Sequence, residues 1–116
     1  MAFEKLIDLH CHLLPHMDDG PRNLNQSLEL ARVAVADGIA TAVLTSHYYE
    51  ENSQGILTKR LKRFKQLEDA LKEHNIPLEI LQGFEVSASH ALLRRRSLGA
   101  LTLAGRSWIL LERPYI

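Results

Sequence analysis

The chain has 116 residues, of which 46% are apolar and 24% charged, a composition typical of a folded globular domain rather than a disordered segment. Fourteen basic residues balance fourteen acidic ones, which argues against a general affinity for nucleic acid or anionic membranes. No apolar run approaches the ~20 residues that span a bilayer, and the first residues, with an acid at Glu4, do not resemble a signal peptide.

The first half of the chain predicts a strand, a helix and a second strand. Residues 5–10 form a short predicted strand, and residues 25–37 a helix that Asn23 or Asn25 caps and Gly38 ends. The nearly all-apolar residues 39–45 are typical of a parallel strand that is buried on both faces.

A second helix over residues 53–74 and a third strand over residues 78–83 complete a βαβαβ pattern. This order predicts the α/β class with a parallel sheet. Residues 100–103 and 107–112, on either side of 104–106, suggest a final β-hairpin. No linker divides the chain, so residues 1–116 are expected to form a single domain. The second helix should bury one apolar face and expose the basic residues of the 59–65 run; that face carries Leu57, Leu61, Phe64, Leu67 and Leu71.

Polar side chains suited to a metal site gather at the predicted strand ends. His10 and His12 are two residues apart at the end of a predicted strand, so their side chains point to the same face. Asp18 and Asp19 follow in a turn, and His47 and Glu85 come at the ends of the next two strands. Because the carboxyl ends of parallel strands share one rim, these groups can converge there. Histidine and carboxylate ligands suit zinc, manganese or iron, which activate water for attack on phosphorus.

Each of these features also has an ordinary structural interpretation. The histidine pair can be polar strand residues, the aspartate turn can simply lead into a helix, and Glu85 can be a solvated acid. Cys11 between the histidines faces the other way, toward packing. It lacks the arginine six residues later that a cysteine phosphatase needs, since Met17 stands there, so water is the expected nucleophile. A lone cysteine also fits a cytoplasmic location.

Three stretches of the chain together resemble a known superfamily. They read IDLHCHLLPHMDDGP, SLELARVAVADGIATAVLTSHYY and LQGFEV. They resemble the PHP superfamily, named for polymerase and histidinol phosphatase, and are most similar within it to the bacterial manganese-dependent protein-tyrosine phosphatases encoded with capsule and exopolysaccharide genes. The combination of HCHLLP with DDGP is far more specific than a histidine pair alone.

The resemblance implies a distorted, TIM-like β/α barrel with a centre of two or three divalent ions, manganese first, with zinc or iron as alternatives. The two motif histidines would ligate one ion, the second aspartate of the turn and the histidine after the second strand would ligate others, and the glutamate of LQGFEV would bridge two. The resemblance implies that the catalytic residues are His10, His12, Asp19, His47 and Glu85. The same five residues and Glu112 would be the metal ligands.

The resemblance also implies a substrate, phosphotyrosine on a tyrosine kinase that controls polysaccharide export. A closed barrel usually needs ~200 residues or more, so the chain corresponds to the N-terminal half of the family's fold, a truncated barrel that starts with the βαβαβ pattern and ends in the expected hairpin. An unclosed sheet leaves edges that need a cover, which predicts a homo-oligomer. Two other functions stay open, an inactive metal-binding remnant that acts by association and another PHP phosphoesterase such as a histidinol phosphatase.

Overall fold

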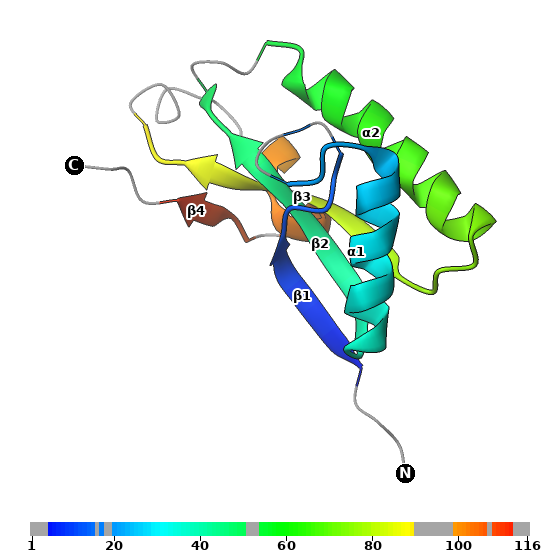
Figure 1. Cartoon of the computed structure of the whole chain (residues 1–116). Helices are drawn as coiled ribbons and strands as arrows, with labels where there is room; N and C mark the ends of the chain where they lie inside the picture. The colour runs from blue at the N-terminus through cyan, green and yellow to red at the C-terminus, as the bar shows by residue number, and fades with distance from the viewer. Residues whose placement is uncertain are drawn as a thin grey trace.

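The computed structural model describes residues 5–15, 17, 20–50, 54–89, 99–106 and 108–112. Four strands form one parallel sheet in the order β1-β2-β3-β4, twisted and curved as Figure 1 shows. None of the helices in these residues is long and apolar enough to cross a membrane. The strands are β1 (Leu6–Cys11), β2 (Ile39–Tyr48), β3 (Glu79–Ser87) and β4 (Leu110–Glu112), and the α-helices are α1 (Leu24–Ala36) and α2 (Ile56–Glu73).

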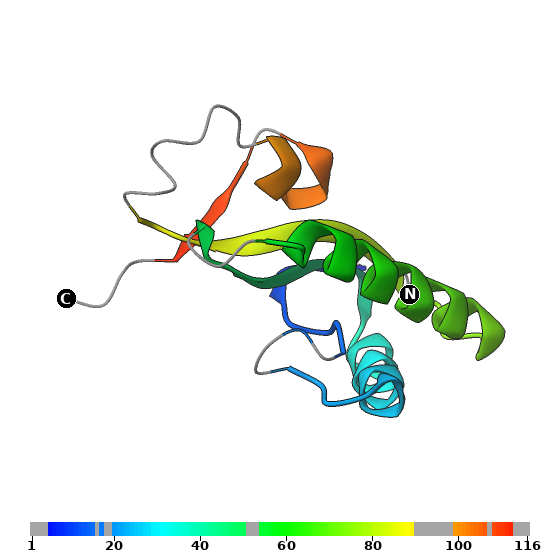
Figure 2. The same ribbon diagram turned by 90° about the horizontal axis from the view of Figure 1, so that it is seen from above.

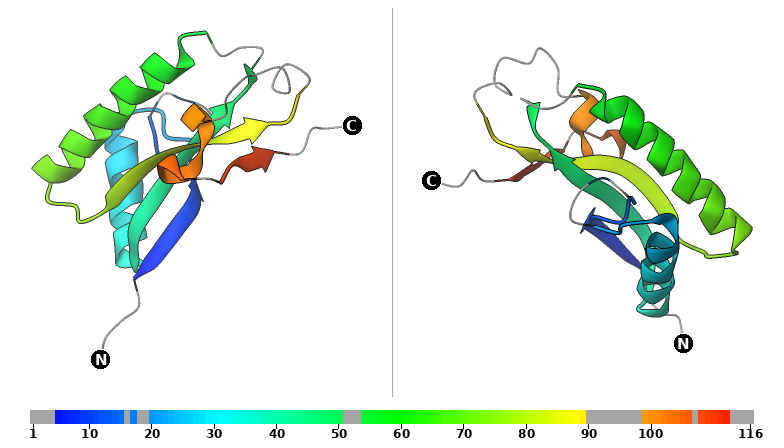
Figure 3. Two further views of the ribbon diagram at one scale, coloured as in Figure 1. Left: turned by 180° about the vertical axis from the view of Figure 1, so that it is seen from behind. Right: turned by 45° about the horizontal axis from the view of Figure 1, so that its top comes forward.

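The predicted βαβαβ order and the parallel pairing are therefore confirmed. Strand β2 runs three residues beyond its predicted end, through Ser46, His47 and Tyr48, because its whole second half pairs with β3. Helices α1 and α2 cover one face of the sheet, and two short 3-10 helices lie on the opposite side from α1 (Figures 2 and 3). These are η2 (Gly99–Leu101) and η3 (Leu103–Gly105).

Helix α1 begins where the sequence predicts. The side chain of Asn23 accepts a hydrogen bond from the backbone N–H of Gln26 at 2.9 Å. The Gln26 side chain in turn accepts from the backbone N–H of Arg22 at 2.8 Å, so two backbone donors at the helix start are satisfied. At the other end Gly38 has a φ of +91°, a left-handed conformation that favours glycine and ends the helix.

Helix α2 departs from its predicted pattern at its first two turns. Phe64, Leu67 and Leu71 are buried, as the periodicity predicts, but Leu57 and Leu61 are exposed. The prediction that the basic run is wholly solvated is wrong for Arg60, which is buried instead. Its guanidinium lies 4.4 Å from the centre of the Phe84 ring, and this cation–π stacking explains why a charged residue sits on the packed face.

The hydrophobic core lies between the sheet and the two α-helices. Leu14, Leu28, Leu44, Leu67 and Ile80 belong to one buried cluster that joins the loop after β1 to both helices and the central strands. A second cluster packs Tyr48, Phe84, Val86 and Leu101 at the other end of β2 and β3. Burial of such side chains is the main stabilising contribution, about 1.5–3 kcal/mol for each large residue.

The predicted β-hairpin is wrong. Residues 99–101 and 103–105 form the 3-10 helices, and β4 pairs in parallel with β3 through Glu85↔Leu110 and Ser87↔Glu112. The physical reason is that the first arm of the expected hairpin packs onto the sheet: Leu103 lies so close to Gly83 that a Cβ there would meet it at 3.0 Å. The last arm is then left to extend the sheet beside β3.

Candidate metal centre

The two motif histidines converge at the end of β1. The Nε2 atoms of His10 and His12 lie 3.2 Å apart, with the ring centres separated by 5.2 Å. The pairing of β1 with β2 is irregular between Asp8 and Cys11, and the Asp8 carboxylate accepts a hydrogen bond from the backbone N–H of His10 at 3.0 Å. The strand end is thus shaped so that both imidazoles face one point.

That point is the carboxylate of Glu85 on β3. Its Oε2 atom lies 3.0 Å from Nε2 of His10, 2.9 Å from Nε2 of His12 and 3.4 Å from Nδ1 of His47. The parallel register places His47 of β2 directly opposite Glu85, which is why strands distant in the sequence meet here. The side chain of Glu85 is only 13% exposed, so this charge is held close to its partners and poorly solvated.

Burial and nearby imidazoles have opposing effects on Glu85. Burial raises the pKa of this carboxyl group, but the hydrogen bond from His10 and the charges of His10, His47 and His12 outweigh it and hold the pKa below its usual value. Glu85 is therefore an anion at neutral pH, the form in which a carboxylate ligates a metal.

Glu112 extends the cluster from the short strand β4. Its Oε2 atom lies 3.3 Å from Nδ1 of His47 and is buried. The β3–β4 register, in which Ser87 lies opposite Glu112, brings this acid to the rim. Two groups of potential ligands result, His10–His12–Glu85 and His47–Glu85–Glu112, in each of which the ligand atoms lie within 4.8 Å of one another.

The donor set fits divalent metal ions. Three imidazole nitrogens point at a single carboxylate oxygen, and two of them, from His10 and His12, approach each other to 3.2 Å. Imidazole nitrogens and carboxylate oxygens gathered around one position are the kind of ligand set that holds zinc, manganese or iron. Glu85 belongs to both groups, so it would be a shared ligand if each group held an ion.

Cys11 lies behind the site and packs against the core, as the strand alternation predicts. Burial raises the pKa of its thiol to about 11, and the nearby Asp8 charge adds to this effect. The thiol is therefore protonated at neutral pH. A neutral thiol that is turned toward the core is a poor nucleophile, which agrees with the expectation that water has this role.

The sequence reasoning missed Thr45, which fixes the strand end that carries the histidines. This fully buried hydroxyl accepts a hydrogen bond from the backbone N–H of Cys11 at 2.9 Å and donates to the Cys11 carbonyl at 3.3 Å. A threonine within an otherwise apolar buried strand is a signal that could have been noticed. Ser27 of α1 anchors the next segment by donating to the carbonyl of Leu13 at 2.7 Å.

The remaining polar candidates do not join the cluster or lie outside the described residues. Asp19, and with it Asp18, falls outside them, so its role as a ligand stays a prediction. The same is true of His16, His90 and the arginines at 94–96. His74 is described and lies at the C-terminal cap of α2, an exposed position on a different element from every residue of the cluster.

A curled parallel sheet with histidines and carboxylates at its carboxyl-end rim defines the class, an α/β half-barrel with a candidate metal centre. The family can be stated as well. The model of the family described as capsular polysaccharide synthesis, CpsB/CapC, matches residues 6–115, and the chain belongs to this family. The resemblance inferred from the three sequence stretches is thereby confirmed.

Relatives with known names agree. The chain is 35% identical over 113 residues to the tyrosine-protein phosphatase YwqE of Bacillus subtilis (strain 168), covering 95% of this chain and 44% of YwqE. It is 31% identical over 111 residues to the tyrosine-protein phosphatase CpsB of Streptococcus agalactiae serotype V, covering 92% of this chain and 44% of CpsB.

A solved structure confirms the fold. It comes from work on YwqE of Bacillus subtilis and CpsB of Streptococcus pneumoniae, described as metal-dependent tyrosine phosphatases, and superposes with a TM-score of 0.79 at 32% identity. The match covers 94% of this chain and 44% of that one. The chain therefore spans less than half the length of the relatives that it matches.

Substitution of Thr45 tests how the histidine-bearing strand end is held. Thr45→Val keeps the shape of the side chain but removes its hydroxyl, leaving the partly buried backbone groups of Cys11 without that partner. We expect the free energy of unfolding to fall by about 1–3 kcal/mol, measured by urea denaturation. Thr45→Ser retains the hydroxyl and is the matched control, with a smaller loss. Equal stability of Thr45→Val and wild type would contradict this role.

Proposed function

We propose that this chain forms the N-terminal part of a metal-dependent protein-tyrosine phosphatase. The observation that carries the proposal is the Glu85 carboxylate, whose Oε2 atom lies within 2.9–3.4 Å of three imidazoles from β1, its extension and β2. The tyrosine-phosphatase names of the relatives and the metal dependence stated for the solved structures support the proposed reaction.

The proposed ligands divide between the two groups. His10 and His12 hold one ion, His47 and Glu112 hold a second, and Glu85 joins them. Asp19 is proposed as a ligand of a further ion on the strength of its motif. Manganese is the proposed metal, with zinc or iron as alternatives that share these ligands, and a complete site takes two or three ions.

Each side chain has a role that follows from its position. When bound, the ions polarise the phosphoryl oxygens and lower the pKa of water, so that a nucleophile forms near neutral pH. The anionic Glu85 offsets the charge of the cations, and the sheet register fixes the separation between the two ligand groups. The phenolic leaving group has a conjugate-acid pKa of ~10, so departure needs less help from a general acid than an alkoxide would.

The proposed substrate is phosphotyrosine on a tyrosine kinase that controls polysaccharide export. The family's description, capsular polysaccharide synthesis, supports this biological setting. We also propose a cytoplasmic location, which is a reducing compartment. The lone cysteine of the chain is consistent with that reducing compartment.

Loss of the Glu85 charge should weaken metal binding. Glu85→Gln is nearly isosteric but removes the anion that both ligand groups share. We expect the affinity for Mn²⁺ to fall at least ~10-fold, since even residues that only orient ligands commonly cost 10–100-fold. Isothermal titration calorimetry measures this, with Glu79→Gln on the exposed start of β3 as the control. Unchanged Mn²⁺ affinity in Glu85→Gln would remove Glu85 from the site.

Hydrolysis of a phosphotyrosine peptide with added Mn²⁺ tests the activity directly. We expect turnover by the wild type, its loss in His47→Ala, and wild-type turnover in His74→Ala, because His74 lies outside the cluster. Circular dichroism checks that both variants fold. Turnover by His47→Ala at the wild-type rate would refute the assignment of this residue.

The same assay separates the alternatives. Mn²⁺ binding without hydrolysis by the wild type would identify a metal-binding module that acts by association. Faster hydrolysis of histidinol phosphate than of phosphotyrosine would identify another PHP phosphoesterase. Both outcomes contradict the proposed phosphatase and neither affects the assignment of the metal ligands.

We also propose that the chain associates with itself through β1. This strand lies at one edge of the sheet and exposes Leu6, Ile7 and Leu9, each by more than half of its surface. An exposed apolar edge strand is a template for pairing with another chain. A second copy supplies an identical edge, and a closed two-fold pairing covers both.

Disruption of this edge should release a monomer. Static light scattering should give the wild type a mass of at least twice the 13.2 kDa of one chain, and Ile7→Lys a mass close to that of one chain. Val33→Lys, at an equally exposed position on α1, should leave the mass of the wild type unchanged. A stable wild-type monomer would contradict self-association.

A further inference from the structure

Arg60 on α2 is a buried cation with incomplete hydrogen bonding. Only 6% of the residue is exposed, and its Nε and Nη1 atoms are buried without a hydrogen-bond partner in the described part of the chain. Burial lowers the pKa of Arg60 to about 10, so the guanidinium remains charged at neutral pH. Stacking on Phe84 satisfies the face of the guanidinium but none of its N–H donors, which are costly to bury unpaired.

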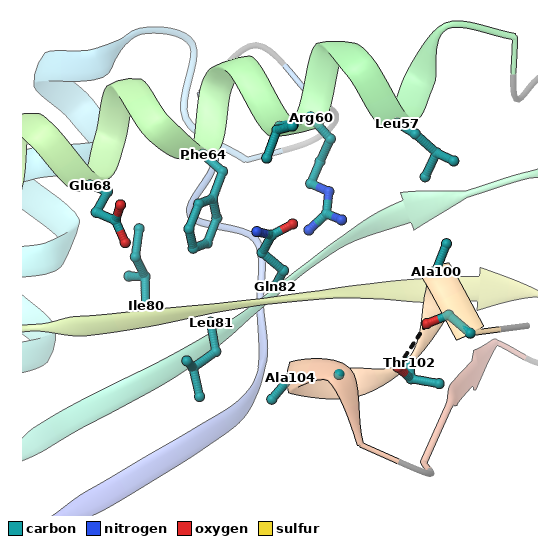
Figure 4. Close-up of a pocket in the computed structure, with 13 residues that line it drawn as sticks. Leu57, Arg60, Phe64, Glu68, Ile80, Leu81, Gln82, Ala100, Thr102 and Ala104 are labelled. Atoms are coloured by element: carbon teal, nitrogen blue, oxygen red, sulfur yellow. Dashed lines mark hydrogen bonds between the residues drawn. The ribbon is translucent and has the colours of Figure 1, made fainter.

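Arg60 lines a groove between α2, β3 and the 3-10 helices. Figure 4 shows Arg60 reaching from α2 toward β3, with Gln82 beside it and Thr102 below the strand. The groove has a volume of about 640 Å³, which is within the usual range of ligand sites. Its walls are mainly apolar, formed by Leu57, Leu61, Phe64, Ile80 and Leu81.

The strand edge along this groove is open. Strand β4 pairs with β3 only from Glu85 to Ser87, and among the described residues no strand pairs with residues 79–83 on that side. Alternate residues of a parallel strand direct both backbone groups to the same edge. Alternate residues of the 80–82 segment, which lines the groove, therefore offer backbone donors and acceptors to an added chain.

The charges in the groove indicate a single negative group rather than several. Glu68 also lines it and stands eight residues beyond Arg60 on α2, about 12 Å further along the helix axis. Glu68 repels an anion at its own end of the groove. The acceptor for Arg60 is therefore expected toward the other end, near Leu57. A carboxylate forms strong charge-assisted hydrogen bonds with a guanidinium group.

We propose that the groove binds an extended peptide that carries one acidic side chain. The peptide backbone adds to the open edge of β3. Its alternate side chains face α2, where the apolar ones pack and the acidic one pairs with the guanidinium of Arg60. Strand addition of this kind takes its affinity from the backbone and its specificity from side-chain pockets. The site is separate from the metal centre, because Phe84 under Arg60 and the adjacent Glu85 point to opposite faces of β3.

Binding of two matched peptides tests the proposal. The probes are fluorescein-labelled Val-Thr-Glu-Thr-Val-amide, whose Val and Glu side chains share one face of an extended strand, and its Gln counterpart, used with EDTA so that metal ions cannot capture the carboxylate. Fluorescence anisotropy should show that the wild-type chain binds the Glu peptide about tenfold more tightly, the scale of one charge-assisted pair. Arg60→Gln should lose this preference, and Lys59→Gln, which removes an exposed charge one residue away, should keep it. Equal binding of the two peptides by the wild type would overturn the proposal.

A second measurement needs no substitution. Amide hydrogen exchange at residues 80–83 should slow when the Glu peptide is added and change much less with the Gln peptide. The same protection by sodium acetate would show that the groove takes a free small acid instead. Concentration-dependent protection without any peptide would show that a second copy of the chain fills it. Either result would contradict the proposal that an acidic peptide occupies the groove.

Discussion

The parallel register between β2 and β3 is the constraint on which the rest of the structure depends. It sets His47 opposite Glu85 and leaves their side chains on the same face of the sheet. A slip of one residue would turn every side chain of a strand to the other face, separating the imidazole from the carboxylate and exposing the core residues Leu44 and Ile80. Core packing and site geometry are therefore fixed by the same hydrogen-bond ladder.

The two outer strands reach the site by different means. Strand β1 pairs with β2 irregularly, and the hydroxyl of Thr45, rather than a regular ladder, holds the backbone of Cys11. Strand β4 has only three residues, yet its pairing with β3 brings Glu112 to His47. Each of the four strands thus contributes at least one candidate ligand, and the segment just after β1 adds His12. Glu85 on β3 belongs to both groups.

The buried face and the open edge of β3 have different chemistry. Phe84 and Val86 pack into the core, while Glu85 between them faces the site. Arg60 stacks on Phe84, so the aromatic ring that closes the core also supports a cation in the groove. One strand thereby separates the candidate metal ligands on one face from the groove that Arg60 lines, so the proposed ions and the proposed peptide would not compete.

The sequence by itself determined the order of elements and most of the candidate ligands. The apolar periodicity predicts β1, α1, β2, α2 and β3 because burial has different periods in helices and strands. The alternation of His10 and His12, and the placement of His47 and Glu85 at strand ends, predict their convergence, since parallel strands share one rim.

Tertiary structure decided what local patterns cannot encode. Residues 99–105 became 3-10 helices instead of a hairpin arm because Leu101 and Leu103 pack on a sheet formed by distant residues. Arg60 was buried because Phe84, 24 positions away in the sequence, offers its ring. The ladder that gives Glu85 three imidazole neighbours and brings Glu112 to His47 likewise joins residues far apart along the chain. Such contacts depend on which strands pair and in what register, and both are determined by the packing of the whole sheet.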